Sequence, residues 1–335
     1  MSEEDFIILM SHNRYIDTLS GNSTFIVYSV EDRKRLYTAG IRTFHEQPAW
    51  GALEPARGEY NFGYLDGIIQ SNRDAGLKSL IMIAGWMFPD WMPSDWFTKS
   101  PNGQIWRNCM SFWNDEAQEY SDNYYTMLRD RYIDQKDIAF FFGEFQGGEA
   151  PQAPWQLYYD VCAVEDYKKV YGTDAMPDIN TPETTEWFGK KVIEHCVRKM
   201  ELLYEPWHEM WNAYQYLMNR WDKNYGIYVQ PELLKKYHEL HPEGQVVLMQ
   251  YTYFDSAHGD DNAAYVDMLR DISGCDVIVE AMFCGGLAKT TPKAIGKGFR
   301  GQILHPQQSG FDNQPLTDGM LNAIRTANDL WKASR

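Results

Sequence analysis

Short apolar runs alternate with amphipathic helical patterns along the 335-residue chain, and this alternation is typical of βα units. A chain of this length could form two small domains or one large barrel, since TIM barrels take about 250 residues and commonly carry insertions. No G-x-G-x-x-G follows an early strand, which disfavours the runner-up, a doubly wound open sheet. We therefore predict an α/β fold, a (β/α)8 TIM barrel that forms a single catalytic domain with loop insertions over residues 1–335.

Eight strands and the helices between them follow from the same alternation. The first strand is either 6–10 or 25–30, and the others are 41–44, 79–84, 138–142, 207–211, 246–251, 276–281 and 301–304. Predicted helices cover 31–39, 65–75, 116–132, 181–204, 231–240 and 318–332. Gly40 and Gly76 end two of these helices as C-caps, and Thr181-Pro182 begins another by the N-cap and Pro-at-N1 preferences.

Charge and composition exclude several classes of function. The net charge of −16 argues against nucleic-acid binding, which needs a basic face. The acidic N-terminus has an apolar run too short for a signal peptide or a membrane span, so we expect a cytoplasmic protein without membrane contact. The five cysteines include no C-x-x-C, which favours reduced thiols. We expect no metal and no cofactor, and nothing in the sequence indicates an oligomeric state.

Residues that directly follow the strands of a barrel share its C-terminal face, where barrel active sites lie. In this chain they are rich in carboxylates, amides and aromatic side chains. Aromatic faces suit the apolar C–H faces of sugars, although many of the 12 tryptophans could equally be core residues. The candidate substrate-binding residues are His45, Trp50, Trp86, Trp91, Gln146, Asn212, Tyr251, Tyr253, His305 and Gln307.

The run IAFFFGEFQGGE at 138–149 is the sharpest site signal. Five apolar residues bring Glu144 to the end of a strand, among phenylalanines that disfavour its charged form. The pKa of such a carboxyl should rise, as a general acid near neutral pH requires. Glu149 is the alternative, and a glutamate that caps a turn is the non-catalytic interpretation.

A second carboxylate should come from another strand. Glu280 lies in the β-branched run DVIVEA at 276–281. A glutamate within so apolar a segment must be paired or functional, because an unpartnered buried carboxylate is costly. We predict that Glu280 is a nucleophile; a buried ion pair, for example with Arg42, is the structural alternative.

The run from Trp50 to Asp66, WGALEPARGEYNFGYLD, reads as an ordered loop with turn residues at its centre. It resembles the W–x–x–(I/L)–E–P–x–x–G–x–Y–x–F–x–x–L–D passage of clan A glycoside hydrolases, notably the family forty-two β-galactosidases. Gly76-Leu77 is similar to the A-G-(L/I)-K passage of that family, and Pro89-Asp90-Trp91 looks like its P-x-W loop. The resemblance covers roughly residues 25–150 and extends over the rest by strand order.

The resemblance implies a (β/α)8 barrel with an acid/base glutamate after strand four and a nucleophilic glutamate at strand seven. Glu144 and Glu280 occupy the matching places. It further implies a retaining mechanism on a carbohydrate substrate, with the carboxyls about 5–5.5 Å apart and a covalent glycosyl-enzyme intermediate. Trp50, Trp86 and Trp91 would be sugar-stacking walls, and Tyr251 or Tyr253 would hydrogen-bond the nucleophile.

The chain departs from the family pattern beside the predicted acid. The family usually has Asn before the acid/base Glu, where this chain has Gly143. Gln146, Asn212 or His45 could replace that Asn at the substrate. Two alternatives stay open: a glycosyltransferase or transglycosylase on the same barrel, with the basic segment 289–300 binding a phosphorylated donor, and a non-catalytic carbohydrate-binding barrel.

Overall fold

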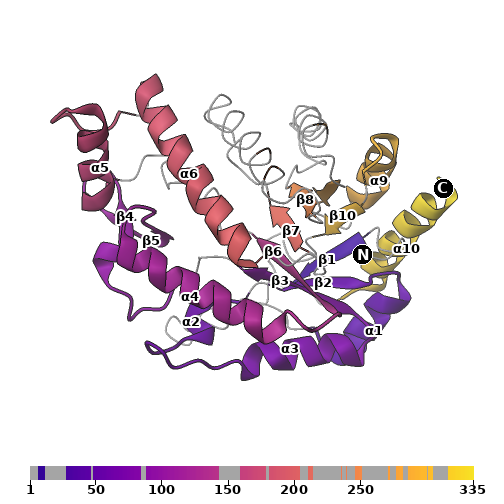
Figure 1. Ribbon diagram of the computed structural model, residues 1–335. Coiled ribbons are helices and arrows are strands. Elements are labelled where there is room, and N and C mark those ends of the chain that lie inside the picture. The colour runs from indigo at the N-terminus through magenta and orange to yellow at the C-terminus, as the bar shows by residue number, and fades with distance from the viewer. Residues whose placement is uncertain are drawn as a thin grey trace.

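A computed structural model describes residues 7–11, 28–46, 48–83, 88–142, 159–178, 181–203, 210–213, 246–250, 277–281, 286–299, 301–304 and 316–335, together with the single positions 235, 239 and 271. Its centre is a ring of parallel strands with helices outside it (Figure 1). The strands are β1 (Ile7–Ser11), β2 (Thr43–Glu46), β3 (Lys78–Ile83), β6 (Ile138–Phe142), β7 (Met210–Ala213), β8 (Val246–Gln250), β9 (Val277–Ala281) and β10 (Gly301–Leu304).

The eight strands pair in chain order, and the first pairs with both the second and the last. Their order in the sheet is β1-β10-β9-β8-β7-β6-β3-β2, which closes a barrel. Leu9 of β1 lies opposite Phe44 of β2 on one side and Leu304 of β10 on the other. Each of the eight predicted strands therefore corresponds to a barrel strand, with boundaries that differ by up to three residues.

Helices cover the outside of the ring. They are α1 (Val30–Thr38), α2 (Trp50–Leu53), α3 (Gly63–Asp74), α4 (Asp115–Tyr132), α5 (Val161–Tyr171), α6 (Pro182–Leu203), α9 (Leu287–Gly296) and α10 (Asp318–Ala333). The N-caps predicted from sequence rules form: the Thr181 hydroxyl accepts the Thr184 amide at 3.3 Å before α6. Gly40 and Gly76 follow α1 and α3 with φ of 107° and 79°, in the left-handed region that suits a helix end.

Two sequence predictions need correction in this part of the chain. The alternative first strand at 25–30 is wrong over its described residues, because Val30 begins α1. The Ser29 side chain accepts a hydrogen bond from the Asp32 amide at 3.1 Å. This N-cap starts a helix where the β-branched residues alone had indicated a strand. The prediction also lacked the antiparallel pair β4 (Phe97–Lys99) and β5 (Ile105–Met110), which forms a separate two-stranded sheet after η1 (Ser94–Trp96).

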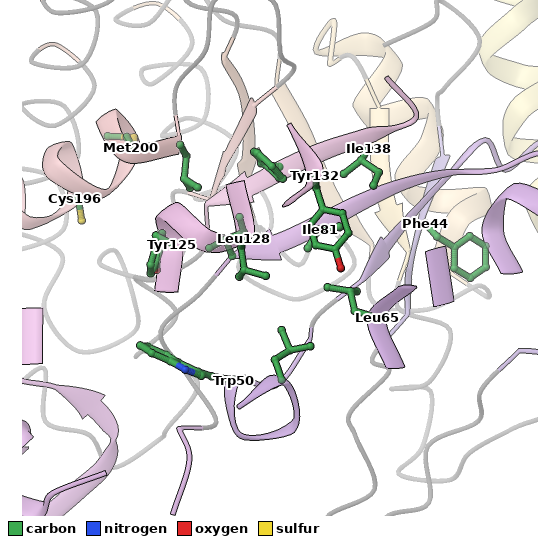
Figure 2. Close-up of a cluster of buried hydrophobic side chains, with 14 of the residues drawn as sticks. Phe44, Trp50, Leu65, Ile81, Tyr125, Leu128, Tyr132, Ile138, Cys196 and Met200 are labelled. Carbon is green, nitrogen blue, oxygen red and sulfur yellow. The ribbon is translucent and has the colours of Figure 1, made fainter. Parts of the chain in front are cut away.

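The hydrophobic core described by the structure lies largely between the helix layer and the outer face of the barrel. Figure 2 shows Ile81 of β3 and Ile138 of β6 beside Leu65 of α3 and Leu128 of α4. All four side chains are at most 3% exposed. Burial of each contributes about 1.5–3 kcal/mol, so this layer holds the strands, and thus the ends that carry the candidate site, in register.

Candidate active site

The carboxyl ends of the parallel strands share one edge of the barrel, and the predicted glutamates belong to two of these ends. Counted around the barrel, β6 is the fourth strand and β9 the seventh. Glu280 is in β9, one residue before the strand ends, and its register partner in β10 is Ile303. Glu144 follows the last residue of β6 by two positions; it and Glu149 lie outside the described residues.

The other predicted substrate-binding residues divide into three groups. Asn212 is in β7, opposite Phe142 of β6 and Leu248 of β8. His45, Trp50 and Trp91 have described side chains. The predictions that lie outside the described residues are Trp86, Gln146, Tyr251, Tyr253, His305 and Gln307.

His45 lies on the inner face of the barrel near the end of β2. Its neighbours Phe44 and Glu46 both contact Arg33 of the outer helix α1. The Arg33 guanidinium lies 4.7 Å from the centroid of the Phe44 ring and 3.1 Å from the Glu46 carboxylate. Successive residues of a strand face opposite sides, so His45 faces inward. Its side chain is 0% exposed, and its register partner in β3 is Leu80. His45 therefore lies on the inner face near the end of a strand, and its contact with a substrate stays a prediction.

A buried polar network holds the outer face of β2 behind His45. Arg33 is 0% exposed and pairs with Glu46, which also accepts the Asn72 amide at 2.8 Å. Asn72 of α3 donates in addition to the Ser79 hydroxyl of β3 at 2.9 Å. The network joins two helices to two adjacent strands. Sequence reasoning missed it because Glu46 carries no spacing signal that distinguishes a buried partner from an exposed one.

Trp50 is not a sugar-stacking wall, contrary to the sequence prediction. It begins the short helix α2 and is 0% exposed. Its ring stacks on Tyr124 of α4 with centroids 3.8 Å apart, and Phe88 packs against it at 5.6 Å. The indole Nε1 donates to the Glu54 carboxylate at 2.7 Å. These contacts make Trp50 a core residue, because no face of the ring is left for a ligand.

Glu54 is the centre of an unpredicted network in the loop after β2. It is 0% exposed, and its carboxylate accepts the Gly58 amide at 2.8 Å, the Trp50 indole and the Tyr120 hydroxyl. Burial, followed by a hydrogen bond to Glu54, raises the pKa of Tyr120. Burial and then the charge of Glu54 also raise the pKa of Tyr60. Glu54-Pro55 was interpreted as turn chemistry alone, which explains why the network was missed.

Trp91 is half-buried and remains available as a candidate wall. Its indole Nε1 donates to the backbone oxygen of Glu54 at 2.9 Å. Its ring packs edge to face with Tyr120 at 5.4 Å and with Trp96 at 6.4 Å. Trp91 belongs to the segment after β3, on the side of the barrel where strands end. The Glu54 network therefore fixes the position of Trp91. Of the predicted sugar-stacking tryptophans that the structure describes, Trp91 is the partly exposed one, since Trp50 is buried.

Three further observations bear on the site. Among the described residues, no three His, Cys, Asp or Glu side chains group as a metal site would require. No helix in this part of the chain is long and apolar enough to cross a membrane. Among the described residues, Cys109 and Cys162 are free thiols, and burial raises the pKa of Cys109 to about 12.

Comparison of the sequence with protein families finds a likeness over the first part of the barrel. Residues 28–142 match the family model described as beta-galactosidase, glycoside hydrolase family 42. The match includes the Trp50–Asp66 passage, β2, β3 and β6, and it ends at the last residue of β6. No curated protein sequence matches the chain.

Solved structures similar to the chain are barrels of the same kind. The catalytic domain of beta-amylase from Paenibacillus polymyxa aligns with 100% of both chains at 13% identity and a TM-score of 0.69. A beta-galactosidase from the psychrophilic Marinomonas ef1 covers 98% of this chain at 12% identity and a TM-score of 0.70. A beta-galactosidase from the Antarctic haloarchaeon Halorubrum lacusprofundi covers 91% of this chain at 15% identity and a TM-score of 0.62. The chain spans only 59% and 56% of these two beta-galactosidases.

The comparisons confirm the resemblance predicted from the sequence. The family match carries the likeness in sequence over the first part of the barrel, and the structural likeness extends the fold over the remainder. The chain is therefore similar in sequence to glycoside hydrolase family 42 over residues 28–142, and it is similar in fold to the structures compared. Its substrate and catalytic residues are matters for proposal.

Proposed function

We propose that the chain is a retaining glycosidase with a single (β/α)8 catalytic domain over residues 1–335. Glu280 is the nucleophile and Glu144 the acid/base, with Glu149 as the alternative. The substrate is a carbohydrate glycoside. A β-galactoside is the first candidate, because the family match and two of the similar structures are beta-galactosidases.

The observation that carries the proposal is the register of β9. Gln302 of β10 donates its side-chain amide to the Thr291 hydroxyl of the outer helix α9 at 2.8 Å, so it faces outward. Val279 is the register partner of Gln302. Paired residues of parallel strands share a face and successive residues alternate, so position 280 belongs to the inner face. A glutamate at an inner position one residue from a strand end is where a barrel enzyme needs a nucleophile.

The chemistry proceeds in two steps. The Glu280 carboxylate attacks the anomeric carbon while the Glu144 carboxylic acid protonates the departing glycosidic oxygen, which breaks that bond and forms a glycosyl ester. Glu144, now a carboxylate, removes a proton from water as the water oxygen displaces the Glu280 ester. The sugar leaves with its original anomeric configuration, and both carboxyl groups return to their starting protonation states.

Glycosyl transfer on the same barrel is the second candidate. It is favoured by three lysines at four-residue spacing, Lys289, Lys293 and Lys297, which lie along α9 and its C-cap in an otherwise acidic chain. Gly143 in place of the family's Asn also favours it. A phosphorylated sugar donor would meet this basic segment.

Turnover of p-nitrophenyl glycosides, beginning with the β-galactoside, tests both candidates. Glu280→Gln and Glu144→Gln should each lower kcat by about 10²–10⁴-fold or more, whereas Glu119→Gln on the exposed face of α4 is the matched control. NMR of the first-formed sugar should show the retained anomer. Wild-type rates in both variants would refute the catalytic assignment, and activity that needs a nucleotide sugar would favour transfer.

A further inference from the structure

The buried Glu54 carboxylate accepts three hydrogen bonds. Three groups from separate parts of the chain converge on it: the Trp50 indole at 2.7 Å, the Gly58 amide at 2.8 Å and the Tyr120 hydroxyl of α4. Hydrogen bonds to a charged acceptor are roughly twice as strong as neutral ones. The carboxylate therefore ties the loop after β2 to the helix layer.

The Trp91 indole is fixed by the same residue. Its Nε1 donates to the Glu54 backbone oxygen at 2.9 Å, while Tyr120, itself bonded to the Glu54 carboxylate, packs against its ring at 5.4 Å. The Arg57 guanidinium lies 5.3 Å from the centroid of the Tyr120 ring and 3.6 Å from the Glu116 carboxylate. The Arg57 side chain is 55% exposed, so hydrogen-bonding groups for a polar ligand lie at the rim of this aromatic cluster.

We propose that Glu54 is a positioning residue that holds the Trp91 indole as a platform for a sugar unit next to the reacting one. The inference rests on the proposed glycosidase function and gives the substrate class, an oligosaccharide of two or more units. Among the described residues, Trp91 packs against Tyr120 of α4, a helix outside the barrel. On this proposal the sugar stacked on Trp91 is a neighbour of the reacting unit and is not itself the unit that Glu280 attacks.

Rigid placement is what makes such a platform effective. Ordering a free tryptophan upon binding would cost conformational entropy that a preorganised ring does not lose. The half-buried Trp91 is held at its nitrogen and by two T-shaped ring contacts, so only the exposed part of the ring is available. Loss of the Glu54 carboxylate would release Tyr120 and Trp50 together, and Trp91 would lose its support without losing its own side chain.

Steady-state kinetics on two matched substrates test the inference. One is the p-nitrophenyl monoglycoside that the enzyme turns over. The other is the trisaccharide built from the same sugar. Trp91→Ala should raise KM for the oligosaccharide about tenfold more than KM for the monoglycoside, the scale of one lost aromatic contact. Glu54→Gln should reproduce this split, and Tyr120→Phe should show a smaller version of it.

A matched control comes from a second indole–carboxylate pair. Trp187 donates to Asp166 at 2.7 Å in the packing between α5 and α6. Trp187→Phe should lower thermal stability without changing either KM. Equal changes in KM for both substrates in Glu54→Gln, or an unchanged oligosaccharide KM in Trp91→Ala, would overturn the inference.

Failure of the proposed function gives a different result. If the wild-type chain turns over no glycoside, calorimetric titration of β-1,4-galactotetraose against galactose still measures the platform. Tetrasaccharide binding that weakens about tenfold in both Trp91→Ala and Glu54→Gln would support the platform in a non-catalytic barrel. No difference between wild type and either variant would overturn it independently of catalysis.

Discussion

The Arg33 guanidinium and the Glu46 carboxylate form an ion pair 3.1 Å long, in which the two side chains are 0% and 1% exposed. The pair joins α1 to the last residue of β2. The Arg33 guanidinium also lies over the Phe44 ring, 4.7 Å from its centroid. Arg33 therefore contacts the residues before and after the inward-facing His45. The position of His45 near the end of its strand thus depends on a contact on the opposite face.

Breaking this pair should be costly. Glu46→Gln leaves the buried Arg33 cation without its counter-charge, and we expect a loss of about 3–5 kcal/mol in the free energy of unfolding. Replacement of both partners by apolar residues, Arg33→Met with Glu46→Leu, should recover most of that loss, because no uncompensated charge remains. Urea unfolding of the single and double variants measures both values. A double variant less stable than Glu46→Gln would contradict this account.

The two glycines that end α1 and α3 should respond differently to alanine. Both have positive φ, but a Cβ on Gly40 would lie 2.3 Å from the Asn328 amide nitrogen, whereas one on Gly76 would meet Tyr37 at 3.4 Å. Gly76→Ala should cost about 1 kcal/mol of strain. Gly40→Ala should cost more, because Asn328 is buried and donates to the Ala39 oxygen at 3.2 Å. Thermal unfolding of the pair, each the control for the other, tests the order.

Trp50 should affect stability rather than substrate binding. Trp50→Phe keeps an aromatic ring on Tyr124 but removes the donor that meets Glu54 at 2.7 Å, leaving a buried carboxylate oxygen one bond short. The expected loss is about 1–3 kcal/mol in the free energy of unfolding. KM for a monoglycoside should stay within the error of the wild-type value. A raised KM with unchanged stability would restore Trp50 as a sugar-binding residue.

The strand order was predictable from the sequence, for reasons visible in particular elements. The run 138–142, IAFFF, is short and apolar, it is followed directly by Gly143, and β6 has these same bounds. The β4–β5 pair was missed because its strands contain Lys99, Arg107 and Asn108, which break the apolar pattern. Its pairing lies outside the barrel, where burial imposes no strict periodicity.

The sequence predicted which residues lie at the ends of strands, but not which side chains surround the residues of the loops. His45 faces inward because strand alternation is local information. Trp50 was misassigned because sequence alone gives a tryptophan's position in a loop but not which side chains surround it. The stacking on Tyr124, 74 positions later in the sequence, is a tertiary contact with no local signal. Glu54 was missed for the same reason, since its donors come from the loop and from α4.

Asp160 provides a test of pH dependence away from the barrel. Its Oδ1 accepts the Ser111 hydroxyl at 2.8 Å and the Ala163 amide at 3.2 Å as the N-cap of α5. Its Oδ2 is buried and has no hydrogen-bond partner among the described residues, and the residue is 2% exposed. Burial raises the pKa of this carboxyl above its usual range, against the lowering effect of its hydrogen bonds.

The sign of the effect follows from that shift. Between the unfolded pKa and the raised folded pKa the native state binds more protons, so stability falls as pH rises through this window. Asp160→Asn keeps the cap oxygen and removes the charge. Relative to wild type, the variant should gain stability as pH rises through this window, by about 1.4 kcal/mol for each unit of pKa shift. Urea unfolding at several pH values, with Asp160→Ala as the control that loses the cap, measures it. A stability difference between Asp160→Asn and wild type that does not change with pH would show that the Asp160 carboxyl titrates alike in the folded and unfolded chains.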